Sequence, residues 1–564
     1  MLQIRCKNNN VTKSFPEGCS LLDVYQEFAD EIKLPYPVVS AKVNNASQGL
    51  KFRLYQNRDV EFLDAREGSG HRVYVRSLSF VLYKATQDLF PGSKLFVEHP
   101  LERGYYCNFK KRQAREAPLG ATADDIRLLR RRMKEIIDTD MPFRRNEATT
   151  EEAIRVFAER GFHDKVRLLE TSGQIYSDYY MLGDTADFYY GPLVPSAGYL
   201  QVWGLEPYHD GLLLRVPDWN DPSRLAERAP MPKTYAMFAE KVRWDVIMHL
   251  SNAGDVNKAV IEGHASELIQ VSEALQEKKI VQIAEEIAHR VATPHHRKGK
   301  GLGQLVLITG PSSSGKTTFC KRLSIQLLAC GLRPLSISTD DYFVDRVNTP
   351  LLPNGDYDFD NVETVEDHLA RLMKGESVEV PEYNFKTGRR EWNGKRLALT
   401  DDSVLILEGI HALNPLLTSH IDDTVKFKIY ISALTSISLD DHNWIPTRDN
   451  RLLRRIIRDY NKGAFTPRET IAQWKNVCDA EDKWIFPFQE TADVMFNSAL
   501  NIEFAVLRPH AEVILGSVPK NCDEYTDAHR LLKFIHYFIP VSDKEIPPTS
   551  IMREFVGGSS FTYR

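Results

Sequence analysis

A run of glycines and small polar residues near the middle of the chain ends in a lysine and two threonines. It reads Gly310-Pro-Ser-Ser-Ser-Gly-Lys-Thr-Thr318 and fits the spacing G-x-x-x-x-G-K-[ST]. Glycines let a backbone fold closely around a polyphosphate, with its N–H groups pointing inward. The lysine reaches the outer phosphates, and the hydroxyl after it ligates Mg²⁺. The run therefore predicts a site for a nucleoside triphosphate.

The segments on either side of this run have the composition that such a site needs. Residues 305–309 are an apolar run typical of a buried parallel strand, and residues 319–328 have the pattern of the helix that should follow. With strand, loop and helix in order, a chance glycine-rich turn is disfavoured. The residues expected to bind ATP are Gly310, Ser312, Ser313, Ser314, Gly315, Lys316, Thr317 and Thr318.

Carboxylates follow two further strand-like runs in the C-terminal half of the chain. The strand candidates there are residues 304–309, 334–339, 403–408 and 425–431. Their alternation with helical stretches predicts a doubly wound, mostly parallel sheet. Ligands in such sheets bind at the carboxyl ends of the strands. Asp340-Asp341 and Glu408 stand at two of these ends, so we expect them near the phosphate loop.

These groups match the requirements of phosphoryl transfer, which needs a cradled triphosphate, a held Mg²⁺ and an oriented acceptor hydroxyl. Asp340 is placed to accept the proton of the acceptor, and Glu408 to hold Mg²⁺ together with Thr317. The alternative for each acid is that it caps a helix or orders a loop. Asp341 is the weaker candidate of its pair and is expected to cap a turn.

A predicted helix over residues 451–459 carries arginines three and four positions apart. The arginines are Arg451, Arg454, Arg455 and Arg458, and the apolar positions opposite them are Leu452, Leu453, Ile456 and Ile457. Such a stripe is often a solvated or salt-bridged face. With a phosphate loop in the same domain, we favour a lid that delivers arginines to the triphosphate.

Bulk composition sets wider limits. The chain has 564 residues, enough for three or four domains, and a net charge of −5, which gives no global attraction to nucleic acid or anionic membrane. Seven cysteines without paired spacing indicate reduced thiols in a cytosol, and packing is favoured over reactivity for Cys320. The start of the chain lacks the apolar core of a signal peptide. No apolar run is long enough to span a membrane. We expect a cytoplasmic protein.

The first 303 residues are predicted to form separate modules. Residues 1–65 suggest a small α+β module with one helix over 20–29, for which Ser20 is the expected N-cap and Asp23 completes a capping box. Residues 66–220 are mixed and include a basic run over 127–134. That run is expected to be a solvated helical face, with a phosphate contact as the alternative. Residues 221–303 have helical spacing and end in a loop of Pro, Gly and charge, whose adjacent histidines are expected to be solvated.

Residues 304 to about 500 resemble the uridine kinase/phosphoribulokinase family of P-loop kinases. Besides the phosphate loop, the matching segments are Ser338-Thr-Asp-Asp-Tyr-Phe343, Asp358-Phe-Asp360, Pro381-Glu-Tyr-Asn-Phe385, Leu407-Glu-Gly-Ile410, Arg454-Arg-Ile-Ile-Arg-Asp459 and Ala492-Asp493. The resemblance implies that Asp340 activates a sugar 5′-hydroxyl. It also implies that Lys316, Arg455 and Arg458 assist the transfer. The residues that it implies for nucleoside binding are Asp360, Tyr383, Phe343 and Arg455.

The chain departs from that family at a position that reads the base. Uridine and cytidine kinases carry a histidine five residues after the tyrosine that matches Tyr383, and here that position is Gly388. Two further lid arginines fall on Gly463 and Phe465 in an alignment without gaps. We therefore expect phosphoryl transfer to be intact, with uridine as acceptor in question.

The N-terminal half resembles the front of threonyl-tRNA synthetase. Residues 1–65 are similar to its ubiquitin-like TGS domain. Residues 66–220 are similar to its editing domain through Leu89-Phe-Pro-Gly-Ser-Lys-Leu95, Gly104-Tyr-Tyr106 and Gly191-Pro-Leu-Val-Pro-Ser-Ala-Gly198. The three histidines and one cysteine of the editing site fall on Arg76, Phe80, Tyr189 and Leu193. We therefore predict neither editing hydrolysis nor zinc. The aminoacylation domain has no counterpart.

Together these features predict a multidomain α/β and α+β protein. The expected units are a TGS-like β-grasp domain (1–65), an editing-like domain (66–220), a helical linker (221–303), a P-loop kinase domain (304–505) and a C-terminal helical extension (506–564). The predicted activity is transfer of the γ-phosphate of Mg·ATP to the 5′-hydroxyl of a nucleoside. Pantothenate or a sugar phosphate is an alternative acceptor. A different class of function is an ATP-responsive regulator that contacts RNA or the ribosome through residues 1–220. Homo-oligomerisation is left open.

Overall fold

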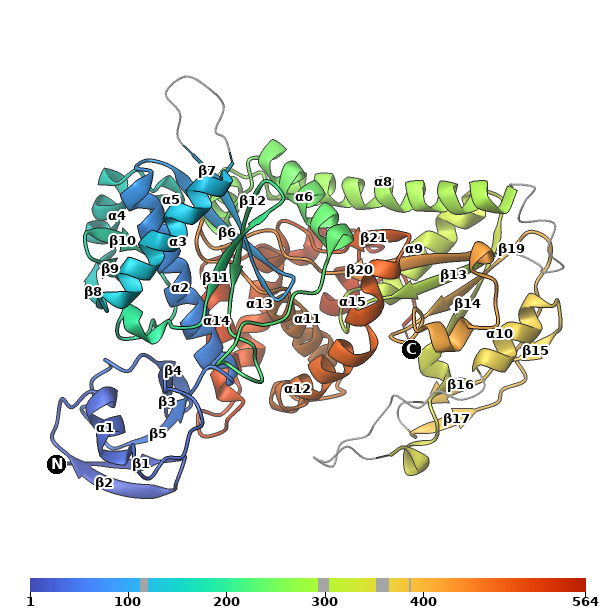
Figure 1. Ribbon diagram of the computed structural model, residues 1–564. Helices are drawn as coiled ribbons and strands as arrows, with labels where there is room; N and C mark the ends of the chain where they lie inside the picture. The colour runs from blue at the N-terminus through green and yellow to red at the C-terminus, as the bar shows by residue number, and fades with distance from the viewer. Residues whose placement is uncertain (112–119, 293–303, 351–364, 385–386, 564) are drawn as a thin grey trace.

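The computed structural model describes residues 1–111, 120–292, 304–350, 365–384 and 387–563. The molecule is elongated, with a small N-terminal sheet at one end and a parallel sheet at the other (Figure 1). The predicted Asp358-Phe-Asp360 segment and the loop with the paired histidines lie outside the described residues. Among the described residues, none of the helices has the length and apolar character to cross a bilayer.

The N-terminal module is a five-stranded sheet with one helix packed on it, in the order β2-β1-β5-β3-β4. Its strands are β1 (Leu2–Cys6), β2 (Val11–Phe15), β3 (Ser40–Val43), β4 (Ala46–Gln48) and β5 (Arg58–Leu63). Helix α1 (Leu21–Phe28) begins at the predicted N-cap Ser20, and Asp23 completes the capping box. The α+β expectation for this module is confirmed.

The next region builds two antiparallel sheets around a long buried helix, α2 (Gly68–Leu89). One sheet has the order β11-β12-β7-β6 and the other β10-β9-β8. Its strands are β6 (Lys94–Leu101), β7 (Gly104–Lys110), β8 (Phe143–Thr149), β9 (Tyr176–Leu182), β10 (Thr185–Asp187), β11 (Gly204–Tyr208) and β12 (Gly211–Arg215). The other helices are α3 (Ala123–Asp138), α4 (Thr150–Glu159) and α5 (His163–Glu170).

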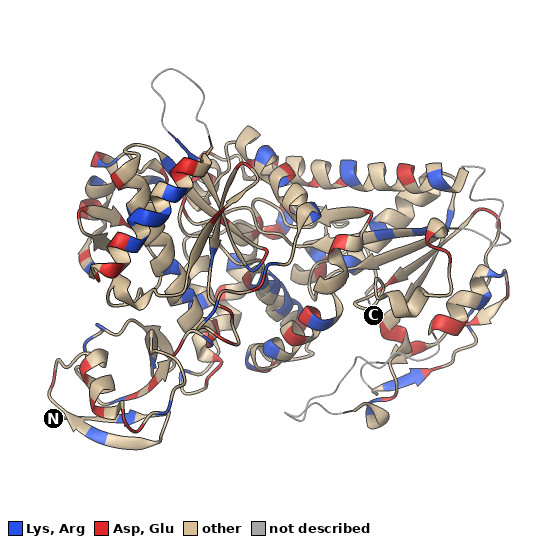
Figure 2. Ribbon diagram, viewed as in Figure 1, with Lys and Arg blue, Asp and Glu red and all other residues tan. Residues whose placement is uncertain are grey.

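The basic run over residues 127–134 lies on α3, where both signs of charge alternate (Figure 2). Four of its five basic side chains pair with carboxylates of the same helix or of α2, and Arg130 donates to the carbonyl of Leu205. The pairs are Arg127–Asp124, Arg131–Glu135, Arg132–Asp88, Arg132–Glu135 and Lys134–Asp138. Surface pairs of this kind mark a solvated helical face, as the spacing predicts.

Three helices connect the two halves: α6 (Pro232–Ile247), α7 (Ala253–Ile261) and α8 (Ala265–Ala292). Helix α8 runs along one side of the molecule toward the parallel sheet (Figure 1). Its isoleucines Ile280, Ile283 and Ile287 are buried in one cluster with Val306 and Phe319. The second half of α8 therefore covers the C-terminal sheet rather than acting only as a linker.

The C-terminal sheet is parallel, with the strand order β14-β19-β13-β20-β21. Its strands are β13 (Gln304–Thr309), β14 (Arg333–Ser338), β19 (Ser403–Glu408), β20 (Lys426–Ser432) and β21 (Val494–Asn497). The four predicted strands lie within one residue of these bounds, and β21 is an addition. Two small two-stranded antiparallel sheets stand outside the parallel sheet. One pairs β15 (Val378–Glu379) with β18 (Arg396–Leu397), and the other pairs β16 (Glu382–Asn384) with β17 (Arg389–Glu391).

The remaining helices surround this sheet and also reach the front of the chain. They are α9 (Lys316–Ala329), α10 (Val365–Met373), α11 (Thr447–Asn461), α12 (Pro467–Trp484), α13 (Glu503–Gly516), α14 (Tyr525–Ile535) and α15 (Arg553–Val556). One buried cluster contains Phe157 and Phe188 from the front of the chain together with Leu453 of α11 and Phe534 of α14. The C-terminal extension is thus part of a core that joins the two halves.

Candidate active site

The predicted phosphate loop lies between β13 and α9, pressed against the end of β20. A Cβ added to Gly310 would lie 2.2 Å from the carbonyl oxygen of Ile431, so only glycine allows this close approach. Gly315 and Ser313 both have left-handed backbones, with φ of 85° and 60°. For serine this conformation is uncommon and marks a loop that its surroundings hold in place.

The loop presents polar groups that the protein leaves without partners. Helix α9 begins without a capping side chain, and the first N–H groups of any α-helix have no partner within it. The hydroxyls of Ser313 and Ser314 are buried and have no hydrogen-bond partner among the described residues. Lys316 Nζ donates to the carbonyl of Pro311 across the loop, 3.2 Å away. This is a set of donors suited to an anion.

Two carboxylates meet this loop from the ends of neighbouring strands. Thr317 Oγ1 donates to Glu408 Oε1 at 3.1 Å. Burial raises the pKa of Glu408 to about 7; the charge of Lys316 opposes this shift and that of Asp340 adds to it. Burial also raises the pKa of Asp340, again opposed by Lys316 and reinforced by Asp341. Two buried acids therefore share the positive charge of Lys316, to which Arg458 adds at Asp340.

These oxygen donors fit a hard divalent cation. Mg²⁺ is usually held by one or two carboxylates together with phosphate oxygens and water. Thr317 and Glu408 would supply a hydroxyl and a carboxylate, and a cation would favour the charged form of Glu408, which burial disfavours. Among the described residues there is no group of three or more His, Cys, Asp or Glu side chains with metal-binding geometry. The donor set therefore suits Mg²⁺ shared with a nucleotide better than a cage built by the protein alone.

The arginine helix differs from the exposed stripe that the spacing predicts. Arg451 and Arg454 of α11 are 1% and 0% exposed. Arg451 pairs with Glu481 and donates to the carbonyl of Ser312, while Arg454 pairs with Glu503 and donates to the carbonyl of Ser313. Their charges are neutralised by buried glutamates, so these two arginines support the loop instead of facing solvent as a lid. The expectation of a free arginine face is corrected here.

Arg455 and Arg458 lie on the same face of α11 as Arg451 and Arg454 but remain partly accessible. Arg455 Nη1 donates to the Ser312 hydroxyl at 2.9 Å, and its Nε lies 3.3 Å from Asp459. Arg458 Nη2 lies 3.1 Å from the same carboxylate, and its charge reaches Asp340. The structure thus brings both arginines to the loop, although each shares Asp459.

Two aromatic side chains lie near the end of β14, where Asp340 and Asp341 follow the strand. Phe343 and Tyr383 are buried, with perpendicular rings whose centroids lie 5.8 Å apart. Asp341 accepts from the backbone N–H of Tyr383 at 3.3 Å. Asp341 therefore ties β16 to the end of β14, whereas the sequence predicts a turn cap; the cap of the short helix over Thr339–Tyr342 is Ser338. Asp360, the other predicted nucleoside contact, lies outside the described residues.

Gly388, the position of the base-reading histidine, is fixed as glycine by its surroundings. Its φ is 68°, and an added Cβ would lie 2.8 Å from Cβ of Arg346. The backbone N–H of Arg346 also donates to the Gly388 carbonyl at 2.8 Å. A histidine there would need a strained backbone and a displaced Arg346. The local backbone at Gly388 therefore disfavours a histidine at this position.

Two contacts at the loop were not anticipated from the sequence. Thr318 Oγ1 donates to Glu554 at 2.6 Å and lies 2.9 Å from the Tyr563 hydroxyl. Glu481 accepts from the backbone N–H of Ser312 at 2.8 Å. No motif marks Glu481. The sequence around Glu554 likewise does not indicate a contact with Thr318, which lies more than 200 positions earlier in the chain.

Cys320, in the first turn of α9, is buried, and burial raises the pKa of its thiol to about 12. It therefore stays protonated and packs, as expected.

The four editing-site positions also come together, in the core of residues 66–220. The rings of Phe80 and Tyr189 lie 5.5 Å apart, and both residues join Leu193 in one buried cluster. Arg76 donates to the carbonyl of Pro192 at 2.8 Å. Apolar side chains and a bonded arginine fill this site.

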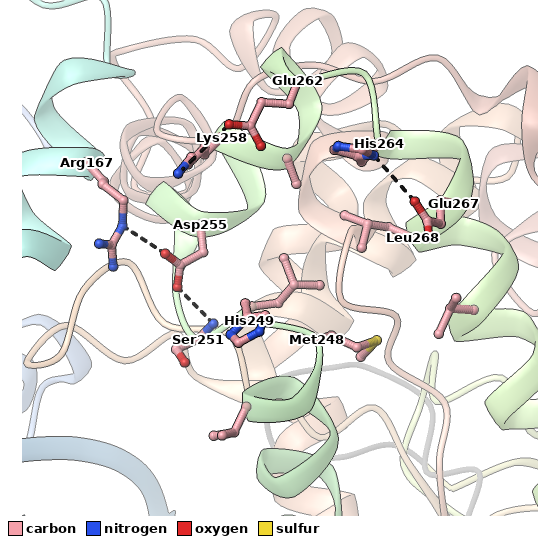
Figure 3. Close-up of a pocket in the computed structure, with 14 residues that line it drawn as sticks. Arg167, Met248, His249, Ser251, Asp255, Lys258, Glu262, His264, Glu267 and Leu268 are labelled. Atoms are coloured by element: carbon pink, nitrogen blue, oxygen red, sulfur yellow. Dashed lines mark hydrogen bonds and ion pairs between the residues drawn. The ribbon is translucent and has the colours of Figure 1, made fainter.

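A separate hollow of about 700 Å³ lies between α6, α7 and the start of α8 (Figure 3). Its charged side chains pair with one another, as in Arg167–Asp255 and Lys258–Glu262. None of its lining residues belongs to the phosphate loop or its carboxylates. We place the candidate site at the loop, where unpartnered donors and raised carboxylate pKa values coincide.

The two halves of the chain are similar to different known proteins. The N-terminal region matches threonine–tRNA ligases. One, from Syntrophomonas wolfei subsp. wolfei, is 30% identical over 203 residues, which are 36% of this chain and 31% of that ligase. Another, from Symbiobacterium thermophilum, is 28% identical over 195 residues, 34% of this chain and 29% of the ligase. The chain thus spans about a third of the length of these curated relatives.

Among solved structures, a possible uridine kinase from Bacillus stearothermophilus is 21% identical, covering 38% of this chain and 100% of that one, with a TM-score of 0.23. A D-glycerate 3-kinase from Cryptococcus neoformans var. grubii is 12% identical, covering 37% and 89%, with a TM-score of 0.26. Residues 305–503 match the model of the Phosphoribulokinase / Uridine kinase family, so the C-terminal region carries the P-loop kinase domain of that family.

Proposed function

We propose that this protein is a Mg·ATP-dependent kinase that phosphorylates the 5′-hydroxyl of a nucleoside. The observation that carries the proposal is that Asp340 and Glu408 lie beside the phosphate loop. Glu408 bonds to Thr317, both acids interact with the charge of Lys316, and helix α9 after the loop has no capping side chain. Phosphoryl transfer needs this combination of a cradle, a cation site and a base beside the acceptor.

Each side chain has a defined task in this mechanism. The loop N–H groups and Lys316 hold the triphosphate, and Thr317 with Glu408 would hold Mg²⁺. When bound, Mg²⁺ would offset negative charge on the phosphates. Asp340 takes the proton of the acceptor hydroxyl while that oxygen bonds to the γ-phosphorus and the bond to the bridging oxygen of ADP breaks. A base whose pKa is raised toward neutrality suits this transfer.

The acceptor is inferred from the aromatic wall beside Asp340. Phe343 follows Asp340 by three positions and packs against Tyr383, and aromatic residues this near the base favour a flat, hydroxyl-bearing acceptor such as a nucleoside. By the family resemblance, Gly388 takes the position of the histidine that reads the pyrimidine edge, and its turn packs against Arg346. We therefore propose a nucleoside other than uridine as the first acceptor to test.

The test is a coupled ADP-release assay with Mg·ATP and uridine, cytidine, adenosine, guanosine, inosine, pantothenate and ribulose 5-phosphate. We expect turnover with one nucleoside, and a loss of about 10²- to 10⁴-fold in Asp340→Asn with ATP binding retained. The matched control is Asp341→Asn, whose amide oxygen still accepts from Tyr383 and should keep most of the turnover.

Near wild-type turnover in Asp340→Asn would exclude Asp340 as the base. Silence across the whole panel, with ATP still bound, would favour the regulatory function of residues 1–220. That function predicts salt-dependent RNA affinity. On α3, Arg127, Arg131, Arg132 and Lys134 are paired with carboxylates, whereas Arg130 donates to the carbonyl of Leu205.

A further inference from the structure

A loop of the C-terminal region is inserted into the front end of the molecule. We call residues 438–444, between β20 and α11, the docking loop, and residues 1–220 the front end. The backbone N–H of Val97 in β6 donates to the carbonyl of Asp441 at 2.8 Å. The N–H of Ala253, at the start of α7, donates to the carbonyl of Ser438 at 2.8 Å. The loop thus bonds to both the front end and the connecting helices.

Side chains of the docking loop extend these contacts. They reach α2, β6, β7 and the end of β10. The contacts are His442 Nε2 with the Leu95 carbonyl at 3.1 Å, the His442 ring with Tyr83 at 4.2 Å, Asn443 Nδ2 with the Phe188 carbonyl at 2.8 Å, and the Trp444 ring with Tyr105 at 4.6 Å. The loop is therefore buried within the front end along most of its length.

Lys165 of α5 lies at the centre of this contact and is 0% exposed. Its Nζ is 3.0 Å from Asp187 in the front end and 3.1 Å from Asp440 in the docking loop. Burial lowers the pKa of Lys165, but the charges of Asp187, Asp440 and Asp164 outweigh this and raise it well above its usual value. One buried cation therefore joins carboxylates from two parts of the chain.

Asp440 also shapes the loop that it anchors. Its Oδ1 accepts from the backbone N–H groups of His442 and Asn443 at 2.8 and 3.0 Å. His442 Nδ1 lies 2.8 Å from Asp187. The conformation of the turn and its attachment to the front end thus depend on the same buried network, which holds one arrangement when every member is satisfied.

The docking loop leads directly into α11, the helix that supports the phosphate loop. Arg451 and Arg454 donate to the carbonyls of Ser312 and Ser313, and Arg455 donates to the Ser312 hydroxyl. Packed interiors transmit displacements because they have little free volume. A shift of the docking loop therefore moves α11 and changes the loop that holds the triphosphate.

We propose that Lys165 is a positioning residue through which the front end sets the nucleotide affinity of the kinase domain. It fixes the docking loop, and the docking loop fixes α11 against the phosphate loop. The turnover part of this inference rests on the proposed function; the affinity part requires only that the phosphate loop binds ATP. The competing explanation is that the buried cluster only stabilises the fold.

The experiment compares Lys165→Met with Lys84→Met in the full chain. Lys84 is also a buried lysine of the front end, and its Nζ pairs with Asp88 and Asp184, both within the front end. We expect ATP to bind about 5- to 50-fold more weakly to Lys165→Met by calorimetry and within about twofold of wild type to Lys84→Met. Both are measured at a temperature where circular dichroism shows folded protein.

Two further readouts separate positioning from stability. Faster hydrogen exchange over residues 310–318 is expected in Lys165→Met and not in Lys84→Met. In turnover, KM for ATP should rise while KM for the acceptor stays unchanged. If Lys165→Met does not fold, Trp444→Ala, which trims the same loop from its other end, should weaken ATP binding in the same way.

Unchanged ATP affinity in a folded Lys165→Met or Trp444→Ala chain would overturn the inference. Equal losses in Lys165→Met and Lys84→Met would do the same, since they would indicate a general loss of structure. A wild-type chain that binds ATP but phosphorylates nothing would reject the proposed function alone, because the affinity comparison would still decide the inference. A wild-type chain that binds no ATP would reject both.

Discussion

Two regions of this molecule stand where known families keep catalytic groups, and they differ in how their side chains are satisfied. Around Phe80, Tyr189 and Leu193 the front end is filled by packed rings and aliphatic groups. The phosphate loop instead keeps an uncapped helix, unpartnered serine hydroxyls and carboxylates with raised pKa values. Sites that bind ligands retain locally unfavourable features that the rest of the fold tolerates. The front-end region keeps one such feature, since the buried Tyr189 hydroxyl also has no hydrogen-bond partner among the described residues, but its other side chains at these positions are apolar or bonded, so we expect it to contribute mainly stability.

Phe80→Ala tests the packed side of this comparison and should have the largest effect. Phe80 is fully buried between Phe143 and Tyr189. Removing its ring leaves a cavity, so we expect a loss of about 3–5 kcal/mol in the free energy of unfolding. Turnover per folded molecule should be unchanged. Urea unfolding followed by tryptophan fluorescence gives the first quantity, and activity normalised to the folded fraction gives the second.

The control is Phe465→Ala, an exposed phenylalanine whose removal should change stability by no more than about 0.5 kcal/mol. If Phe80→Ala abolished turnover while the chain remained folded, the region around Phe80 and Tyr189 would be functional and the contrast between the two regions would fail.

Glu408→Gln tests the phosphate-loop region of this comparison, and its effect on the free energy of unfolding should depend on pH. The raised pKa means that the folded state binds a proton more tightly than the unfolded state. Stability is therefore lost as pH rises from the ordinary glutamate value through about 7. Removing the charge should stabilise the ligand-free protein at pH 8, by about 1–3 kcal/mol, with little change at pH 4. Thermal melts at both pH values measure this difference.

Glu469 provides a control of opposite sign. Hydrogen bonds from the backbone and side chain of Thr466 lower its pKa, so its charge stabilises the fold above the usual glutamate pKa. Glu469→Gln should therefore lose stability at pH 8 and not at pH 3. A Glu408→Gln variant that behaved like Glu469→Gln would show that Glu408 is a structural carboxylate.

The parts of the site that could be predicted from sequence depend on short-range order. A strand, a loop and a helix follow one another directly, so Gly310 to Thr318 specify the cradle. The rule that ligands meet the carboxyl ends of parallel strands then locates Asp340 and Glu408. The strand β21 was not predicted because Val494–Asn497 is too short for a clear apolar pattern.

Other features were not predictable because their partners are far away in the sequence. The spacing of Arg451 and Arg454 indicates a helix face, but its burial depends on Glu481 and Glu503, 30 and 49 positions later. The network around Lys165 joins residues up to 277 positions apart. Helical periodicity carries no information about which carboxylate will neutralise a buried cation.

Ser314→Ala and Ser77→Ala compare a buried hydroxyl from each region. Ser314 Oγ has no partner among the described residues, so its removal should leave stability within about 0.5 kcal/mol and weaken ATP binding by about 0.5–1.5 kcal/mol. Ser77 Oγ donates to the Val73 carbonyl and accepts from the Val194 N–H. Its loss should cost about 1–3 kcal/mol of stability without changing ATP affinity. Chemical unfolding and calorimetry distinguish the two, and a reversed pattern would contradict the comparison.

Glu554→Gln should have the smallest effect, and it acts on nucleotide affinity. Glu554 holds the hydroxyl of Thr318 and places a negative charge beside the loop, where it adds to the raised pKa of Glu408. An amide can still accept the Thr318 hydrogen bond but does not repel phosphate. We expect ATP to bind tighter by up to about 1 kcal/mol at low salt, and the gain to shrink as salt screens the charge.

The control is Glu545→Gln, because Glu545 is an exposed glutamate of the same closing segment. This change should leave the ATP affinity unchanged. Weaker ATP binding in Glu554→Gln would mean that this carboxylate serves the bound nucleotide, and the closing segment would then belong to the site rather than oppose it.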